Sequence, residues 1–278
     1  MTSQLSDVSH MVTASPAARA AFDDPAADVP VDISVVIVSY GTGDVLDEAL
    51  SRLDQASRAT DRVVEVVVVD QLHPDRGHST ADRLSLTTAG VHLVRPDANL
   101  GFGGGNELGV VVARGRLLCF LNPDVFVPTD FFDPLIDTSI KHPLAIIAPR
   151  LVDLSGTLVE AGQILDRNGR TRAIDASLIQ SVRADYASAA CWVLPRHLHE
   201  LVGGFDPRYH PAYFEDVDYA LRLERVGGTT EIVDLDVVHL GGASVDGPVT
   251  HADLQREIFI DRWGSLLSRR RIACVEAL

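Results

Sequence analysis

An acidic cluster and a single histidine lie close together in residues 213–244. Glu215, Asp216 and Asp218 open a predicted helix in YFEDVDYALRLERVGG. His239 ends a predicted strand in VDLDVVHLGGAS. A carboxylate at a helix start can act as a general base, and an imidazole can hold a metal ion, if the fold brings both to one cleft. These side chains are the leading candidates for chemistry in the sequence.

Helix geometry separates the roles of two of these acids. Successive helical residues turn by about 100°, so Asp216 and Asp218 point about 200° apart and cannot both face one reacting hydroxyl. Asp218 lies four residues before Arg222 and three after Glu215, which favours pairing along the helix. We therefore expect Asp218 and Glu215 to support the site and Asp216 to face the cleft. The alternative for Asp216 is an acid favoured only by the helix dipole, an effect of about 0.3–1 kcal/mol.

Short apolar runs alternate with helical stripes from Ile33 onward and predict an α/β fold. The predicted strands span residues 33–38, 63–69, 91–94 and 117–121, and the stripes span 45–53 and 108–113. This rhythm is typical of a mostly parallel sheet that is flanked by helices. Ligands of such sheets bind beyond the carboxyl ends of the strands. Asp70 and Asp124 both fall at such ends.

The glycine-rich run NLGFGGGN at residues 99–106 does not fit a dinucleotide-binding fingerprint. The pattern GxGxxG would need glycine at a position held by Asn106 or Leu108, and the run follows the third predicted strand rather than the first. Glycines can let the backbone pass close to a ligand or to another segment, or can form a tight strand-to-helix turn. Both interpretations stay open.

The composition fits an enzyme and argues against several other classes. The chain has 278 residues, of which 46% are hydrophobic, so it can bury a large core. A net charge of −15 argues against a nucleic-acid partner. We find neither a signal peptide nor an apolar stretch of about 18 residues that would predict a transmembrane segment. The three cysteines, at positions 119, 191 and 274, are widely spaced, which favours reduced thiols in a cytoplasmic protein.

The two ends of the chain differ in character. Residues 1–30 are rich in Ala, Ser, Asp and Pro without a sustained period, so we expect a mobile N-terminal extension. Apolar residues at helical spacing in 246–278 predict an amphipathic C-terminal helix. This helix could pack on the core, form a homodimer or touch a membrane, and its mixed charges favour the first two. Arg269, Arg270 and Arg271 follow it. They could meet an anionic group, although such runs are typically solvated.

Seven motifs follow one another along the chain: VVIVSY at 35–40, VVVVD at 66–70, NLGFGGGN at 99–106, LNPD at 121–124, VGGFD at 202–206, YFEDVDYALRL at 213–223 and HLGGAS at 239–244. In this order they resemble the motifs of family-2 inverting glycosyltransferases, nearest to the rhamnosyltransferase-like and galactofuranosyltransferase-like branch. The similarity implies a GT-A fold with a nucleotide-binding half at about 31–125 and an acceptor half at about 126–245. Such enzymes move a sugar from a nucleotide-diphosphate donor to an acceptor hydroxyl, usually with Mg²⁺ or Mn²⁺.

The same resemblance implies roles for individual residues. Asp216 would be the general base. Asp70 would bond the nucleobase or ribose, whereas its alternative is a loop cap. The other residues that it implies in nucleotide-sugar binding are Ser39, Tyr40, Asn99, Gly103, Gly104, Asn106, Asn122 and Asp124.

A metal site is implied at Asp124 and His239. Asp124 resembles the last acid of the family's DxD motif, and Asn122 stands in place of the first acid, which lowers the negative charge of the site. A hard divalent ion prefers oxygen ligands and leaves positions for diphosphate oxygens, so one protein carboxylate is sufficient. His239 would be a second ligand, although a lone histidine is more often structural.

The region 150–195 gives weaker indications. Gly156, Gly162 and Gly169 divide short segments that could form hairpins over the acceptor side. The segment YASAACWVLPR resembles the family's small-residue segment before a helix at 196–202. Trp192 and Tyr213 are candidates for stacking on an acceptor sugar, although aromatic side chains are commonly buried.

The sequence thus predicts a metal-dependent inverting glycosyltransferase, cytoplasmic or peripheral at the inner face of the membrane. The resemblance favours dTDP- or UDP-linked donors and allows a glycan, a lipid-linked or a small natural-product acceptor. One rival is a sugar-nucleotide nucleotidyltransferase, but SYGTGD at 39–44 lacks the basic, glycine-rich phosphate loop of that class. A second rival is a noncatalytic nucleotide-sugar-binding protein.

Overall fold

The computed structural model describes residues 30–75, 77–78, 91–179, 182–241 and 250–269. The chain divides into two units, Met1–Pro30 and Val31–Leu278. The predicted N-terminal extension lies outside the described residues except for Pro30, as do Arg270, Arg271 and Cys274. All the helices and strands named below belong to the second unit.

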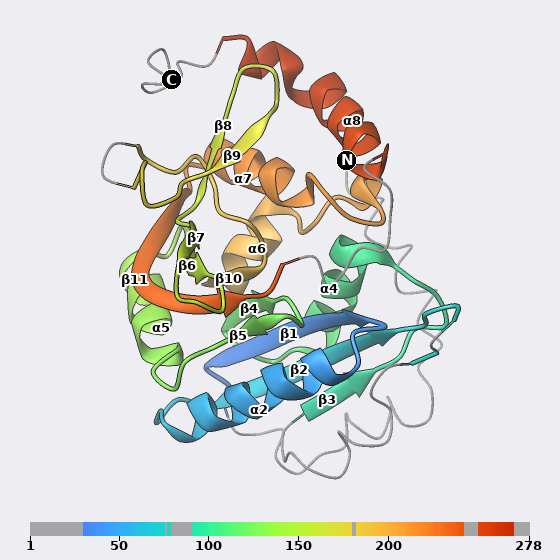
Figure 1. The fold of residues 1–278 in the computed structure, drawn as a ribbon, viewed down its shortest axis with the longest axis vertical. Helices are drawn as coiled ribbons and strands as arrows, with labels where there is room; N and C mark the ends of the chain where they lie inside the picture. The colour runs from blue at the N-terminus through green and yellow to red at the C-terminus, as the bar shows by residue number, and fades with distance from the viewer. Residues whose placement is uncertain (1–29, 76, 79–90, 180–181, 242–249, 270–278) are drawn as a thin grey trace. The chain divides into compact units, whose positions relative to one another are not determined.

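The predicted strands of the first half form one side of the sheet (Figure 1). They are β1 (Ile33–Tyr40), β2 (Val64–Gln71), β3 (Val91–Val94) and β4 (Leu117–Leu121). β1 lies between β2 and β4, β3 flanks β2, and all these pairs are parallel. The buried apolar side chains of β1, β2 and β4 explain the pairing, because parallel strands are covered on both faces, whereas β3 is half-buried. The α/β prediction is therefore confirmed.

The second half turns the sheet into a mixed one. Among the described residues, nine strands pair in the order β3-β2-β1-β4-β10-β6-β11-β5, with β7 attached to β6. β10 runs antiparallel to both β4 and β6, and β11 runs parallel to β6. β5 runs antiparallel to β11, and β7 runs antiparallel to β6. The bounds are β5 Val125–Phe126, β6 Ala145–Val152, β7 Leu158–Glu160, β10 Cys191–Pro195 and β11 Thr229–His239. The sheet is thus parallel in its first half and mostly antiparallel at the junction with the second.

Helices cover both faces of this sheet (Figure 1). Alternate residues of β1 point to opposite faces, so Val35 and Ile37 join one apolar cluster and Val36 and Val38 join the other. The first cluster includes side chains of α2 and α5, and the second includes side chains of α4, α6 and α7. The helices are α2 Asp44–Arg58, α4 Gly101–Val112, α5 Phe132–Lys141, α6 Arg196–Val202, α7 Glu215–Arg225 and α8 Thr250–Leu267.

The glycines of the glycine-rich run lie within α4, and Asn99 and Leu100 precede the helix. The helix begins at Gly101, and its glycines let it approach the sheet closely. A Cβ atom at Gly105 would lie 2.7 Å from Val38 Cγ1, and one at Gly109 would collide with Val36. Of the interpretations left open by the sequence, close contact with another segment is the one that these two positions support.

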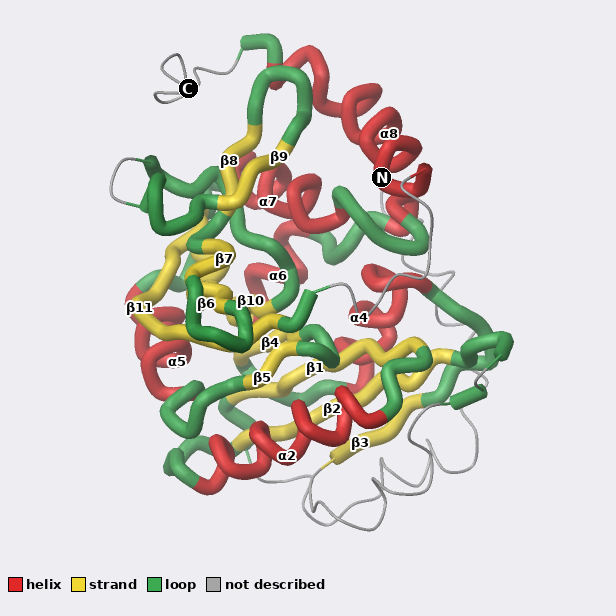
Figure 2. Tube along the Cα trace, in the orientation of Figure 1, coloured by secondary structure: helices red, strands yellow, loops and turns green. Residues whose placement is uncertain are grey.

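The C-terminal helix α8 packs on the rest of the unit. Its side chains Phe259, Trp263 and Leu267 are fully buried in a cluster with side chains of α7. The short strands β8 (Gln163–Leu165) and β9 (Thr171–Ala173) form a hairpin beside α8 (Figure 2), as the contact of Gly169 with Ile260 requires. The predicted C-terminal helix and a hairpin within 150–195 are both present. Leu254 and Leu266 of the helix are exposed rather than part of its buried face, and the place of the hairpin over the acceptor side stays a prediction. In the part of the chain that the structure describes, no helix is both long and apolar enough to cross a membrane.

Candidate active site

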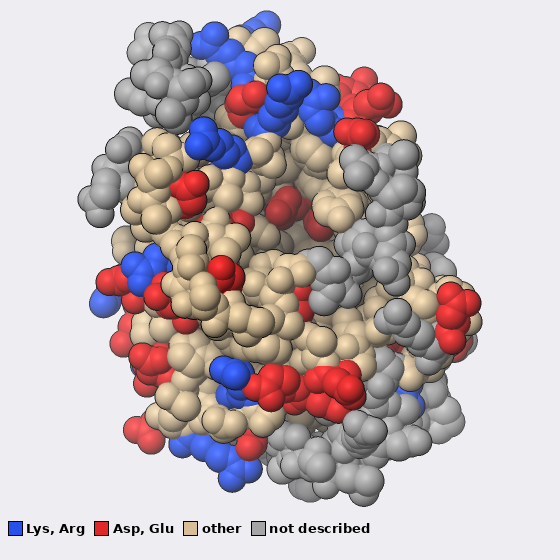
Figure 3. All heavy atoms as spheres, viewed as in Figure 1, with Lys and Arg blue, Asp and Glu red and all other residues tan. Residues whose placement is uncertain are grey.

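A pocket of about 540 Å³ joins the two halves of the sheet at the carboxyl ends of its first strands. In Figure 3 it is a hollow with acidic side chains at its floor. Its walls come from β1, β2, the start of α4, the residues after β4, the β8–β9 hairpin and the segment leading into α7. The lining residues are Val38, Tyr40, Gln71, Asn99, Gly101, Phe102, Asn122, Pro123, Gln163, Thr171, Tyr186, Ser188, Ala189, Ala190, Pro211, Ala212, Tyr213, Phe214, Glu215, Asp216, Val217 and His251.

Asp216 lines this pocket from the first turn of α7. Its Oδ1 accepts a hydrogen bond from the backbone N–H of Val217 at 2.7 Å. Burial raises the pKa of Asp216 to about 6, and the charge of Glu160 adds to this rise. A carboxylate with a pKa near the working pH is suited to accept a proton from a substrate hydroxyl.

Glu215 precedes Asp216 and is 7% exposed. Burial, together with the charge of Asp216, raises the pKa of Glu215 well above its usual range. Its Oε2 atom is buried without a hydrogen-bond partner. A supporting role for Glu215 stays a prediction.

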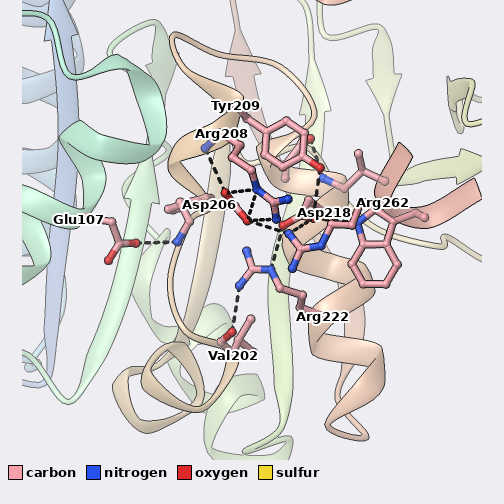
Figure 4. Close-up of polar contacts among 12 residues, drawn as sticks. Glu107, Val202, Asp206, Arg208, Tyr209, Asp218, Arg222 and Arg262 are labelled. Atoms are coloured by element: carbon pink, nitrogen blue, oxygen red, sulfur yellow. Dashed lines mark hydrogen bonds and ion pairs between the residues drawn. The ribbon is translucent and has the colours of Figure 1, made fainter. Parts of the chain in front are cut away.

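Asp218 points away from the pocket, toward α8 (Figure 4). Its Oδ2 accepts a hydrogen bond from Arg222 Nε at 2.8 Å, so the predicted pairing along the helix is confirmed. Its Oδ1 accepts hydrogen bonds from Arg262 Nη1 and Trp263 Nε1, both at 2.7 Å, and from the Tyr209 hydroxyl at 3.2 Å. The separation of Asp216 from Asp218 that helix geometry predicted is present.

The pairing of β5 with β11 brings Asp124 and His239 together. His239, the last residue of β11, lies opposite Val125, and Leu240 N–H donates to the Asp124 carbonyl. His239 Nε2 is 3.4 Å from Asp124 Oδ1, which is buried without a hydrogen-bond partner. Buried unpartnered oxygens call for an explanation such as a bound ion.

The donor atoms at this position suit a divalent metal ion. One carboxylate oxygen and one imidazole nitrogen could hold Mn²⁺ or Mg²⁺ if diphosphate oxygens and water complete the shell. Asn122 Oδ1 is a further buried oxygen without a partner. Among the described residues, no group of three or more His, Cys, Asp or Glu side chains is placed to hold a metal. The substrate would therefore supply the remaining ligands.

The residues predicted to bind the nucleotide sugar are only partly brought together. Tyr40 and Asn99 line the pocket. Ser39 and Asp70 are register partners at the ends of β1 and β2 and both are fully buried. Arg95 Nε lies 3.8 Å from Asp70 Oδ2. Contacts of Ser39 and Asp70 with a nucleotide would require their surroundings to move, and their roles stay predictions.

The remaining predicted nucleotide-sugar contacts lie in α4. Gly103 and Gly104 are partly exposed in its first turn, and their role stays a prediction. Asn106 is 1% exposed, and its Nδ2 donates to the Phe102 carbonyl one turn earlier. Like the roles of Ser39 and Asp70, its contact with a nucleotide sugar stays a prediction.

The structure corrects the prediction for Trp192. Its side chain is fully buried in β10, where its ring stacks on Phe205 at 6.0 Å and its Nε1 donates to the Ala187 carbonyl. A sugar cannot stack on a ring whose faces are covered. Tyr213 is 40% exposed and lines the pocket, so its acceptor-binding role stays a prediction.

Several pocket residues carried no signal in the motifs. Glu160 is buried near the pocket, where its Oε1 accepts from Ser188 N–H at 2.8 Å and its Oε2 from Gln163 Nε2 at 2.6 Å. Burial raises the pKa of Glu160. His251 lines the pocket from the first turn of α8. The small-residue segment YASAAC was the one local signal, since Ser188 and its neighbours form part of the wall.

Comparison with known proteins decides the family. Residues 34–201 match the sequence profile of the family described as "Glycosyl transferase family 2", which is more than half of the chain. The chain belongs to glycosyl transferase family 2. The family predicted from the seven motifs is therefore confirmed.

Curated relatives of this family 2 glycosyltransferase include a hexosyltransferase and a rhamnosyltransferase. The low-salt glycan biosynthesis hexosyltransferase Agl10 of Haloferax volcanii is 23% identical over 215 residues, which are 73% of this chain and 66% of the relative. The N-acetylglucosaminyl-diphospho-decaprenol L-rhamnosyltransferase of Mycobacterium tuberculosis is 27% identical over 238 residues, which are 74% of this chain and 75% of the relative. The chain thus spans about two thirds to three quarters of their lengths.

Solved structures support the fold. The crystal structure of GalNAc-T7 with UDP, GalNAc and Mn²⁺ has a TM-score of 0.69 and 14% identity, and the match covers 86% of this chain and 50% of that one. The crystal structure of S. aureus TarS has a TM-score of 0.55 and 14% identity, with 86% of this chain and 44% of that one covered. The chain therefore spans about half the length of these structures, and its fold is that of GT-A glycosyltransferases.

Proposed function

We propose that this family 2 glycosyltransferase moves a sugar from a nucleotide-diphosphate donor to an acceptor hydroxyl with inversion of the anomeric centre, and that Asp216 is the general base. One observation carries the proposal. The pocket that contains Asp216 also contains Tyr40 and Asn99 from the nucleotide-binding half. A donor and an acceptor can therefore meet in front of one carboxylate with a raised pKa.

The chain's own residues would divide the chemical work in the following way. In-line attack needs the base and the leaving diphosphate on opposite sides of the sugar. Asp216 is mostly ionised above pH 6, since burial raises its pKa to about 6, and it would take the proton of the acceptor hydroxyl. The Val217 N–H orients the Asp216 carboxylate. A Mg²⁺ or Mn²⁺ ion held by Asp124 and His239 would neutralise charge on the leaving diphosphate.

The proposed substrates follow from the resemblance and the relatives. A dTDP- or UDP-linked hexose is the favoured donor. The relatives are named for glycan synthesis and for a diphospho-decaprenol acceptor, so we favour a glycan or lipid-linked acceptor over a small natural product. We further propose action in the cytoplasm, at the inner membrane face if the acceptor is lipid-linked. Formation of a homodimer through α8 is a separate proposal.

A turnover assay tests the proposed function. The protein is incubated with a panel of dTDP- and UDP-sugars and candidate acceptors, and nucleoside diphosphate release and product anomeric configuration are measured. We expect chelation to suppress turnover by about 10²-fold or more and Mn²⁺ or Mg²⁺ to restore it, because the ion stabilises developing charge. Asp124→Ala and His239→Ala should show the same loss.

The control for this assay is Asp130→Ala, which removes an exposed acid a few residues from the site. This variant should retain wild-type turnover and metal response. Full activity of a metal-free preparation would rule out the proposed roles of Asp124 and His239. Retention of the anomeric configuration would rule out the inverting mechanism. Formation of a sugar nucleotide from a nucleoside triphosphate would support the rival nucleotidyltransferase.

A further inference from the structure

A single arginine of the C-terminal helix joins both ends of the pocket segment. Residues 211–217 line the pocket and include Asp216, and the longer segment 207–217 is flanked in sequence by Asp206 and Asp218. Arg262 Nη1 lies 2.7 Å from Asp206 Oδ2 and 2.7 Å from Asp218 Oδ1. Figure 4 shows the guanidinium between the two carboxylates. We call this contact the Arg262 bridge.

The other two arginines of this network each contact one of the two acids, and the Tyr209 hydroxyl donates to Asp218 from within the segment. Arg208 pairs with Asp206 at 2.6 Å, and Arg222 pairs with Asp218 at 2.8 Å. Of the three arginines in the network, Arg262 is thus the one that contacts both acids. Burial would raise the pKa of Asp206, but the hydrogen bonds of Arg208 and the charges of Arg208 and Arg262 hold it at about 2. Asp206 is therefore ionised at neutral pH and forms an ion pair with Arg262.

One face of α8 contacts the same segment and the start of α7. Gln255 Nε2 donates to the His210 carbonyl at 2.7 Å, the Phe259 ring lies 5.2 Å from the Phe214 ring, and Trp263 Nε1 donates to Asp218. These residues and Arg262 follow one another at spacings of four, three and one residues, which places them on one face of the helix. The packing of α8 is therefore directed at the wall that carries Asp216.

The wall needs such support because its backbone is strained. Tyr213 has a φ of 80° and Phe214 a φ of 68°, a conformation that bulky L-residues rarely adopt. Such conformations persist when the surrounding structure holds them. Phe214 is the residue immediately before α7, so its conformation sets the direction in which the first turn, and Asp216, enters the pocket.

We propose that Arg262 is a positioning residue for sugar transfer, and that the Arg262 bridge holds the segment 207–217 in the conformation that directs Asp216 into the pocket. The inference rests on the proposed function of Asp216 as the base. Helix α8 follows the seven motifs in sequence, and the proposal gives it an indirect part in catalysis, through the position of Asp216.

The test compares three variants of the full chain. Arg262→Met keeps the aliphatic stem and removes the charge and donors, Arg262→Lys keeps the charge, and Arg225→Met is the matched control. Arg225 also contacts α8, with its guanidinium 4.4 Å from the Trp263 ring, but it lies at the other end of α7. Each variant is checked by circular dichroism and thermal unfolding, and is assayed at a temperature where it is fully folded.

The expected result is a split between kcat and KM. Arg262→Met should lower kcat by about 10-fold to 100-fold, because a small misplacement of a catalytic group is costly. The donor KM should change by less than about 3-fold, since a positioning defect does not remove uniform binding. Arg262→Lys should recover part of kcat, and Arg225→Met should keep wild-type values. Wild-type kcat in folded Arg262→Met, or equal losses in both Arg262 variants, would overturn the proposal.

Hydrogen exchange separates this proposal from the proposed function. The backbone amides of residues 210 and 212–217 should exchange faster in Arg262→Met than in the wild type, while the exchange rates of the β1 and β2 amides should stay unchanged. This measurement needs no turnover, so unchanged exchange at 210–217 would overturn the proposed positioning role of the Arg262 bridge even if no substrate were known. Normal turnover of Asp216→Asn would instead overturn the proposed function and leave the exchange result standing.

Discussion

The acids on the two sides of helix α7 lie in opposite environments. On the side that faces α8, the carboxylate of Asp218 is fully buried and accepts hydrogen bonds from Tyr209, Arg222, Arg262 and Trp263. On the pocket side, Glu215 Oε2 is buried without a partner and burial raises the pKa of Asp216 to about 6.

The difference teaches which acid is structural and which is available for chemistry. Native proteins satisfy buried polar groups, so a carboxylate with a full set of donors is explained by the fold alone. A carboxyl group with a raised pKa in a pocket is a candidate functional group because its unfavourable environment has no structural benefit. Variants at the two positions should therefore fail in different ways.

The largest expected effect is the loss of activity in Asp216→Asn. The amide keeps the shape of the side chain but cannot accept the hydroxyl proton, so kcat should fall by about 10²- to 10⁴-fold. Nucleotide binding should survive, because Tyr40 and Asn99 lie on another wall of the pocket. Steady-state kinetics and calorimetric titration with the nucleoside diphosphate check both statements. Near-normal turnover by the folded variant would remove Asp216 from the mechanism.

Asp218→Asn should instead damage stability. It removes the buried charge that pairs with Arg222 and leaves Arg262 with Asp206 as its one remaining acid in the network. Breaking a buried ion pair typically costs about 3–5 kcal/mol. We expect a lower free energy of unfolding by urea, in contrast to Asp216→Asn. The matched control is Asp234→Asn, which alters an ion pair whose acid is 86% exposed and should change stability by less than about 1 kcal/mol. Equal free energies of unfolding for the Asp218 and Asp234 variants would contradict a structural role for Asp218, and the contrast with Asp216 would fail.

The contrast between Asp216 and Asp218 could be predicted from sequence because it depends on local geometry. Two residues on a helix are separated by about 200° whatever the helix packs against, and Arg222 lies within the same helix as its partner. The strands of the first half could be predicted equally well, since apolar runs such as the four valines of VVVVD are typical of buried parallel strands.

Other features depend on tertiary pairing and could not be derived in this way. Trp192 lies on β10, which is flanked by β4 and β6, and every residue of this strand is buried. A five-residue apolar run does not reveal whether its strand is central or at an edge. Glu160 and Arg262 reach the site because β7 pairs with β6 and α8 packs on α7, and neither contact has a signal in the nearby sequence.

The smallest expected effect is on the pH dependence of stability. It has opposite signs for Asp216, in the pocket, and for Asp206, which pairs with Arg262. Burial raises the pKa of Asp216 to about 6, so between about pH 4 and 6 the folded state keeps a proton that the unfolded chain loses. This group's contribution to stability therefore falls as the pH rises through that window. Arg208 and Arg262 lower the pKa of Asp206 to about 2 against the effect of burial. Its contribution is present above about pH 4 and is lost as the pH falls toward 2.

Thermal unfolding of two variants between pH 3 and 8 would check these signs. Asp216→Asn should have a higher Tm than the wild type at pH 8 and the same Tm near pH 4, because only the charged carboxylate is penalised by burial. Asp206→Asn should have a lower Tm at pH 8, with a difference that shrinks as the pH falls below about 4. A destabilised Asp216→Asn at pH 8 would mean that its carboxylate is held by the fold as Asp218 is, and the distinction between the two sides of α7 would then fail.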